Sequence, residues 1–170
     1  MEGYATTFDS PYLLYEIDGI KYYEVIDRHA LDSADMSDII LQYDHEGKVY
    51  ARKSNNSLIV EPDNHGLFIC ADLGRSSAAK DLYDEISNGL ITRMSWAFTV
   101  TEEDYNRETR TRTIKKVKKV YDVSAVSIPA NDDTEISARS YINGAIECEK
   151  QELFERRKKK LKLKLELEDF

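Results

Sequence analysis

Residues 91–100, ITRMSWAFTV, constrain the fold most, because large apolar side chains alternate there with small or polar ones. Met94, Trp96 and Phe98 occupy every second position. Such alternation sends successive side chains to opposite faces of a β-strand. The segment therefore predicts a strand that buries its three large side chains and directs Ser95 to the other face. A reactive serine and a harmless surface serine would both fit there.

A hairpin is predicted just upstream, in segment 57–73, SLIVEPDNHGLFICADL. Apolar residues flank the turn cluster PDNHG, in which Asn64 and Gly66 tolerate positive φ. The next segment, 76–89, predicts a surface helix, with a serine at the N-cap position and Asn88-Gly89 as the stop signal. We expect this helix to pack through Leu82, Tyr83 and Ile86.

A second β region follows the strand at 91–100. Residues 101–113, TEEDYNRETRTRT, are densely charged and predict a long exposed hairpin loop. In the following segment Ile114, Val117 and Val120 recur every three residues, which fits neither a strand nor a good helix. A β-bulge would reconcile this spacing with a strand. From Val120 onward the alternation is regular.

The length of 170 residues suits one domain, which we place at residues 1–142, followed by a charged helical tail at 143–170. The net charge of −8 argues against a general nucleic-acid binder. No apolar stretch approaches a membrane span, and no secretion signal is evident. Cys70 and Cys148 lack metal-ligand or disulfide spacing, which favours a reducing cytoplasm.

Three histidines are candidates for a general base, because serine nucleophiles need a group that titrates near neutral pH. His45, in IILQYDHEGKVYAR, follows an apolar run at an expected strand end and could face a cleft. A structural or solvated role remains open for it. His65 at the predicted hairpin turn and His29 in IDRHALDS fit surface roles better.

Asp122 is a candidate third member of a catalytic set. It lies between apolar neighbours in YDVSAVSIP, and a carboxylate inside a strand needs an edge position or a partner. A histidine would be such a partner, while an outward-facing aspartate is the alternative. No pair of histidines and carboxylates has metal-ligand spacing, so we expect neither a metal nor another cofactor.

Several stretches carry a family resemblance. In order and spacing, GYATTF, LQYDHEGKVYAR, SLIVEPDNHGLFICADL, DLYDEISNGLITRMSWAFTV and YDVSAVSIPANDDTEISARS resemble the HK97-type phage prohead proteases, which act in capsid maturation. The resemblance implies an α+β, mainly β fold: a compact barrel of the herpesvirus-assemblin type with surrounding helices. It assigns His45 as base and Ser95 as nucleophile. The acid position corresponds to Asp122, where many relatives carry glutamate.

The resemblance also implies a function and a partner. Such a serine endopeptidase would cleave the scaffolding segment of the phage major capsid protein inside the prohead, in the host cytoplasm, and could cut its own tail. For the oxyanion hole we consider the loop at 129–139, with Arg139 as a supporter. A homo-oligomer is left open.

Two functions other than a serine endopeptidase also remain open. A non-catalytic capsid assembly or scaffold factor would bind coat protein through the charged tail. An esterase acting on small molecules is weaker, because no nucleophile elbow is present.

Overall fold

The computed structural model describes residues 1–17, 19–128 and 135–137. In this part of the chain the elements are ten strands, one 3-10 helix and one α-helix. They are β1 (Glu2–Thr7), β2 (Tyr12–Ile17), β3 (Ile20–Ile26), β4 (Ile40–Tyr43), β5 (Glu46–Arg52), η1 (Lys53–Asn55), β6 (Leu58–Pro62), β7 (Gly66–Ala71), α1 (Ser77–Ser87), β8 (Arg93–Asn106), β9 (Thr111–Val126) and β10 (Glu135–Ser137).

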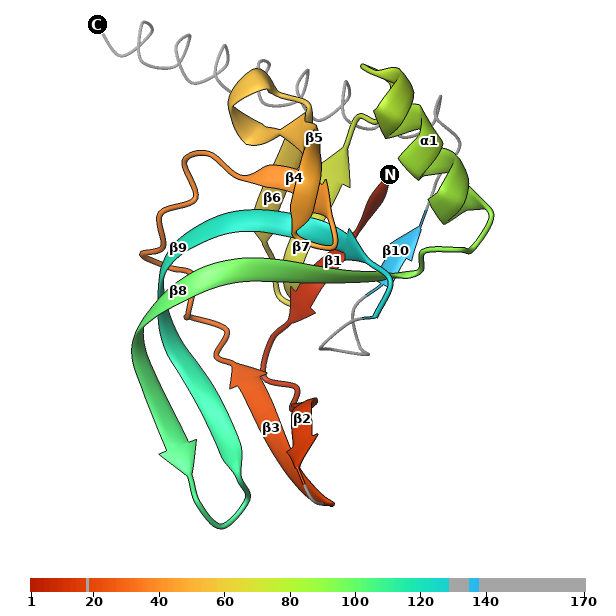
Figure 1. The fold of residues 1–170 in the computed structure, drawn as a ribbon. Coiled ribbons are helices and arrows are strands. Elements are labelled where there is room, and N and C mark those ends of the chain that lie inside the picture. Colours follow the sequence, from red (N-terminus) through yellow and green to blue (C-terminus); the bar gives the residue numbers. More distant parts are fainter. Residues whose placement is uncertain (18, 129–134, 138–170) are drawn as a thin grey trace, which may run out of the picture.

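The strands form two sheets (Figure 1). The smaller sheet has the order β10-β1-β7-β6, and the larger one β2-β3-β9-β4-β5, with β8 paired to β9. The expectation of a mainly β fold is confirmed. The expected closed barrel is not, because strand pairing within the described residues leaves two separate sheets. The predicted tail lies outside these residues, and so does Cys148.

Strand β9 is the centre of the larger sheet. One edge pairs with β8 in antiparallel fashion, and the other pairs in parallel with β3 and then with β4. Because β3 and β4 share this edge, β9 brings together residues that are far apart in the sequence. The long curved β8–β9 ribbon crosses the front of the molecule in Figure 1.

Bulges explain the three-residue spacing along β9. Register shifts against β8 leave Lys115, Lys118 and Tyr121 without a directly opposite residue. Each extra residue shifts the alternation by one position, so that side chains three apart face inward. At most 1% of each of these inward residues is exposed: Ile114, Val117 and Val120. The expected bulge is therefore confirmed, at both Lys115 and Lys118. A third one, at Tyr121, interrupts the regular alternation expected from Val120 onward.

The prediction of a long loop at residues 101–113 is wrong, because the loop is much shorter than expected. Strand β8 continues to Asn106 and β9 starts at Thr111, which leaves only residues 107–110 as the loop. The charges lie on exposed strands and form ion pairs across them, including Lys116 with Glu102 and Lys115 with Asp104. Opposite charges facing each other let a polar ribbon keep strand pairing without an apolar face.

The predicted hairpin and helix are both present. Strands β6 and β7 form the hairpin, but Asn64 and Gly66 are not among the residues with positive φ. Gly66 serves close packing instead, because a Cβ there would lie 2.1 Å from the Thr6 carbonyl oxygen of β1. Helix α1 begins at the Ser76 cap, and Gly89 follows it with φ +71°.

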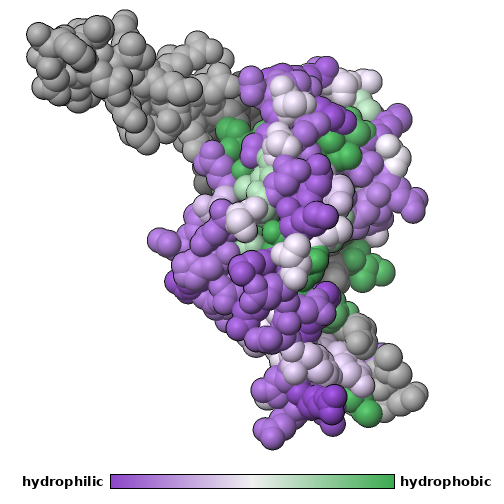
Figure 2. Space-filling view, turned by 90° about the vertical axis from the view of Figure 1, so that its left-hand side faces the viewer, coloured by the Kyte–Doolittle hydropathy of each residue, from purple (hydrophilic) through white to green (hydrophobic). Residues whose placement is uncertain are grey.

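The hydrophobic core contains side chains from both sheets and from α1, and it holds the start of β8 in place. Met94 is fully buried and Trp96 is 8% exposed. The Trp96 ring stacks on Phe98, with centroids 4.0 Å apart. These contacts confirm that the large side chains of the opening segment face the core. The outer surface is polar by comparison: Figure 2 shows a face on which hydrophilic side chains predominate.

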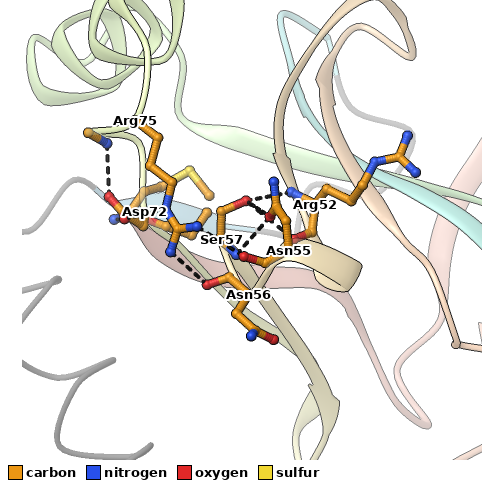
Figure 3. A network of polar contacts seen from close by, with 9 residues as sticks. Arg52, Asn55, Asn56, Ser57, Asp72 and Arg75 are labelled. Carbon is orange, nitrogen blue, oxygen red and sulfur yellow. Dashed lines mark hydrogen bonds and ion pairs between the residues drawn. The ribbon is translucent and has the colours of Figure 1, made fainter.

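A polar network fixes the connection between β5 and β6, at the end of β5 remote from His45 (Figure 3). The Ser57 hydroxyl contacts the Asn55 amide oxygen at 2.5 Å. The Arg75 guanidinium donates to the carbonyl oxygens of Asn55 and Asn56 and to the Asp72 carboxylate. The network joins this connection to the turn before α1.

Candidate active site

His45 lies in the tight turn between β4 and β5. Tyr43 and Glu46 are opposite each other, so Asp44 and His45 form a two-residue turn. Their φ angles of +46° and +61° match a type I′ turn, in which both central residues are left-handed. Aspartate and histidine adopt this region more readily than most residues with a side chain. The turn projects His45 at the end of β4, as the sequence predicts.

The His45 ring is bound to Asp122, which lies 77 residues away in the chain. Nδ1 of His45 and Oδ1 of Asp122 are 2.6 Å apart. The Asp122 side chain is only 9% exposed, whereas the His45 side chain is 34% exposed. An ionised carboxylate can only accept, so Nδ1 is the donor in this contact, and in the neutral imidazole Nε2 then keeps its lone pair. An aspartate is therefore long enough to reach the histidine in this chain.

Ser124 also binds Asp122. Its hydroxyl donates to the same Oδ1 atom at 2.8 Å, and Ser124 is fully buried. The two residues are two positions apart in β9, so their side chains share one face of the sheet. No role for Ser124 was predicted from the sequence, although the D-x-S spacing in a strand is a signal for this contact.

Asp44 fixes the turn to the end of β9. Its Oδ1 accepts the Ser127 N–H at 2.9 Å, and its Oδ2 accepts the Ser127 hydroxyl at 2.8 Å. Its own N–H donates to the Ala125 carbonyl oxygen at 3.0 Å. The Ser127 N–H, more than any other group, lowers the pKa of Asp44 below its ordinary value. No sequence pattern predicts this role of Asp44.

Ser95 lies on β8, directly opposite Ser124 on β9. Directly opposite residues of an antiparallel pair share a face, with Cβ atoms about 4.5–5.5 Å apart. Ser95 is therefore on the face that carries Asp122 and Ser124. Within the described residues no hydrogen bond joins Ser95 to His45. The structure thus brings His45 and Asp122 into contact and places Ser95 one strand away from Asp122.

A pocket of about 240 Å³ adjoins this part of β8, and Ser95 is among its lining residues. Tyr12, Glu24 and Arg112 form its polar part: the tyrosine hydroxyl donates to one Glu24 oxygen, and the guanidinium donates to the other at 2.9 Å. Burial, followed by the Glu24 charge, raises the pKa of Tyr12. Its apolar walls include Trp96 and Phe98, whose side chains lie on the face of β8 opposite to the Ser95 side chain, and its lining includes neither His45 nor Asp122. Apolar walls with a few fixed polar groups are typical of ligand pockets. Sequence patterns gave no sign of this cluster.

The remaining candidates lie elsewhere. His29 is exposed and contacts Asp32 at 3.1 Å, and His65 packs edge-on against Tyr4 at the β6–β7 turn. Arg139 falls outside the described residues, as does most of the loop proposed for the oxyanion hole. Across the described ranges no cluster of three metal-ligating side chains occurs. Nor is any helix in them long and apolar enough to cross a membrane.

Comparison with known proteins gives two matches. The family model described as caudovirus prohead serine protease matches residues 1–146. The prohead protease of Enterobacteria phage HK97 is 31% identical over 84 residues, which are 48% of this chain and 37% of that protein. The aligned region thus spans little more than a third of that relative's length. No solved structure matches the chain. From the family match, the chain belongs to the caudovirus prohead serine proteases.

Proposed function

We propose that this protein is a serine endopeptidase in which Ser95 is the nucleophile, His45 the general base and Asp122 the orienting acid. The observation that carries the proposal is the 2.6 Å contact between His45 Nδ1 and Asp122 Oδ1. This contact leaves the Nε2 lone pair available to accept a proton, which is what a general base requires.

The reaction would proceed through an acyl-enzyme. Nε2 of His45 removes the Ser95 hydroxyl proton as Oγ attacks the scissile carbonyl carbon. The tetrahedral oxyanion then collapses, the C–N bond breaks, and the His45 imidazolium gives its Nε2 proton to the leaving amine. A water molecule, deprotonated by the same nitrogen, hydrolyses the ester and restores Ser95. The Asp122 carboxylate stabilises the imidazolium throughout.

Two neighbouring serines share the relevant face, and the contacts favour Ser95 as the nucleophile. Ser124 is fully buried, and its hydroxyl proton is donated to Asp122. A substrate carbonyl could not reach it without displacing that bond. Ser95 is only partly buried, so its hydroxyl is more accessible than that of Ser124. Resting enzymes commonly show a loose serine–histidine geometry that tightens when substrate binds.

The substrate we propose is the unprocessed coat protein of the phage, cleaved at its scaffolding segment inside the immature capsid within the host cell. Family membership supports this choice, and so does the name of the relative, a prohead protease. The charged tail at 143–170 would be a targeting segment or a site of self-cleavage.

The decisive experiment incubates purified protein with unprocessed coat protein and follows cleavage by gel electrophoresis and intact mass. Wild type should release the scaffolding segment, and Ser95→Ala should release none. Asp122→Asn should lower kcat by roughly 10⁴-fold, because the wrong histidine tautomer becomes available. Thr99→Ala is the matched control, since it removes an exposed hydroxyl from the same strand and should cleave normally.

Equal cleavage by wild type and Ser95→Ala would overturn the assignment of Ser95. The competing function, a non-catalytic scaffold factor, makes the opposite prediction. Under that hypothesis Ser95→Ala and His45→Gln would support capsid assembly normally, whereas deletion of residues 143–170 would abolish incorporation into the particle.

A further inference from the structure

The contacts of Asp44 point to a role in placing the His45 imidazole, and the argument rests on the proposed function. We propose that Asp44 is a positioning residue: its clamp on Ser127 fixes the turn that carries His45 against the end of β9. Two carboxylate contacts of 2.9 and 2.8 Å form the clamp, and a backbone bond from Asp44 to Ala125 supports it.

The turn needs such outside support because its backbone is unfavourable. Both Asp44 and His45 are left-handed, a conformation that is costly for residues with a Cβ atom. The usual residues of this turn type are Asn-Gly or Asp-Gly. Glycine at position 44 would satisfy the backbone but could not reach Ser127. An aspartate here satisfies the turn and also bridges to the next strand.

The bridge matters because β9 carries the partner of His45. Asp122 lies in β9, and Ser127 directly follows the last residue of that strand. The clamp therefore ties the histidine and its carboxylate to one rigid element. Without it, the pairing of β4 with β9 and the backbone bond from Asp44 to Ala125 would still hold the base of the turn, but the side-chain support of the turn against β9 would be reduced to the imidazole contact. A displacement of about 1 Å at a catalytic group can lower the rate by about 100-fold.

The test compares Asp44→Gly with Asp44→Asn in the full-length chain. Asp44→Gly keeps the turn but removes the clamp, so kcat should fall by about 10- to 100-fold while KM stays within about twofold. Asp44→Asn retains an acceptor for the Ser127 N–H and should recover most of kcat. Spectra of ¹⁵N-labelled histidine, assigned with His45→Gln, should show a fixed Nδ1–H tautomer in wild type and mixed tautomers in Asp44→Gly.

Asp63→Gly is the matched control. Asp63 accepts backbone N–H groups of His65 and Gly66 in the β6–β7 turn, so the variant removes a carboxylate clamp from a turn outside the site. It should leave kcat and the His45 spectrum unchanged. Ser127→Ala provides a milder variant if Asp44→Gly does not fold, with a smaller loss of kcat expected.

If Asp44→Gly kept the wild-type kcat and the wild-type tautomer of His45, the proposed positioning role of Asp44 would be overturned. An equal loss in the Asp63→Gly control would overturn it as well, because the effect would then be general destabilisation. Failure of the wild type to cleave any coat protein would count against the proposed function alone. The histidine spectra would still decide whether Asp44 fixes the imidazole.

Discussion

Ser124 illustrates what a single buried hydroxyl can do for a carboxylate. It donates to the Asp122 oxygen that also accepts from His45, so it limits rotation of the carboxylate around its own axis. Burial makes the bond important, because a buried carboxylate with one donor fewer is poorly solvated. Ser124 and Asp44 therefore fix the two partners of the histidine–aspartate contact from opposite sides.

Replacing Ser124 with alanine should loosen Asp122 without removing any group that reacts. We expect kcat to fall by about tenfold and stability to drop by about 1–2 kcal/mol, because a buried hydrogen bond is lost. Peptide hydrolysis and urea denaturation would measure the two effects. Ser57→Ala removes another buried serine hydroxyl, one that binds the end of β5 remote from His45, and should lower stability alone. Unchanged kcat in Ser124→Ala would argue against this role.

Among the elements, helix α1 is the one whose start and end are set most clearly by local sequence signals. Ser76 accepts the Ala79 N–H at 3.1 Å, and the apolar side buries Leu82 and Ile86. These signals lie within a dozen residues of one another and could be read from the sequence. The ribbon at 101–113 could not, because its strand pairing depends on charges across the hairpin rather than on periodicity.

Removal of the α1 N-cap should destabilise the fold only modestly. Ser76→Ala should lower the free energy of unfolding by about 1 kcal/mol, since one N-terminal N–H loses its acceptor. Urea denaturation followed by circular dichroism would measure the change. Ser87→Ala, at the other end of the same helix, is the control and should change stability by less than about 0.5 kcal/mol. A cost of the same size in both variants would show that capping is not the cause.

At the scale of the whole molecule, the candidate site depends on pairings that no local pattern encodes. The types of His45, Ser95 and Asp122 and their strand context could be predicted from the sequence. Their relative placement could not, because β9 pairs with β4 in parallel and the bulges set its register. Asp44 and the Glu24 cluster were missed for the same reason, because they act through residues far away in the chain, whereas Ser124 binds Asp122 on its own strand.

The stability of the whole fold should depend on pH partly through Asp72. Burial opposes its ionisation, but the Arg75 side chain and the Gly74 N–H outweigh burial and lower the pKa of Asp72 below its ordinary value. A carboxyl with a lowered folded-state pKa stabilises the fold above its unfolded pKa, and this contribution disappears as the pH falls through the folded value.

Asp72→Asn should therefore lower the melting temperature at pH 7 by about 2–4 °C, for a loss of about 1 kcal/mol after solvent screening. The difference from wild type should shrink as the pH falls below about 4, because the carboxyl of the unfolded wild-type chain takes up a proton first and that of the folded chain follows at lower pH. Melting curves at pH 7 and pH 3 would measure it. Asp81→Asn, at an exposed position of α1, serves as the control. A difference that persists unchanged at pH 3 would contradict the electrostatic explanation.

The central position of β9 has a consequence during synthesis on the ribosome. His45 and Ser95 are translated before Asp122, so a nascent chain that lacks β9 has no acceptor to set the imidazole tautomer and no scaffold between β4 and β8. An incomplete polypeptide therefore cannot assemble the site. If the proposed chemistry is correct, the order of translation itself delays hydrolysis until most of the domain has emerged.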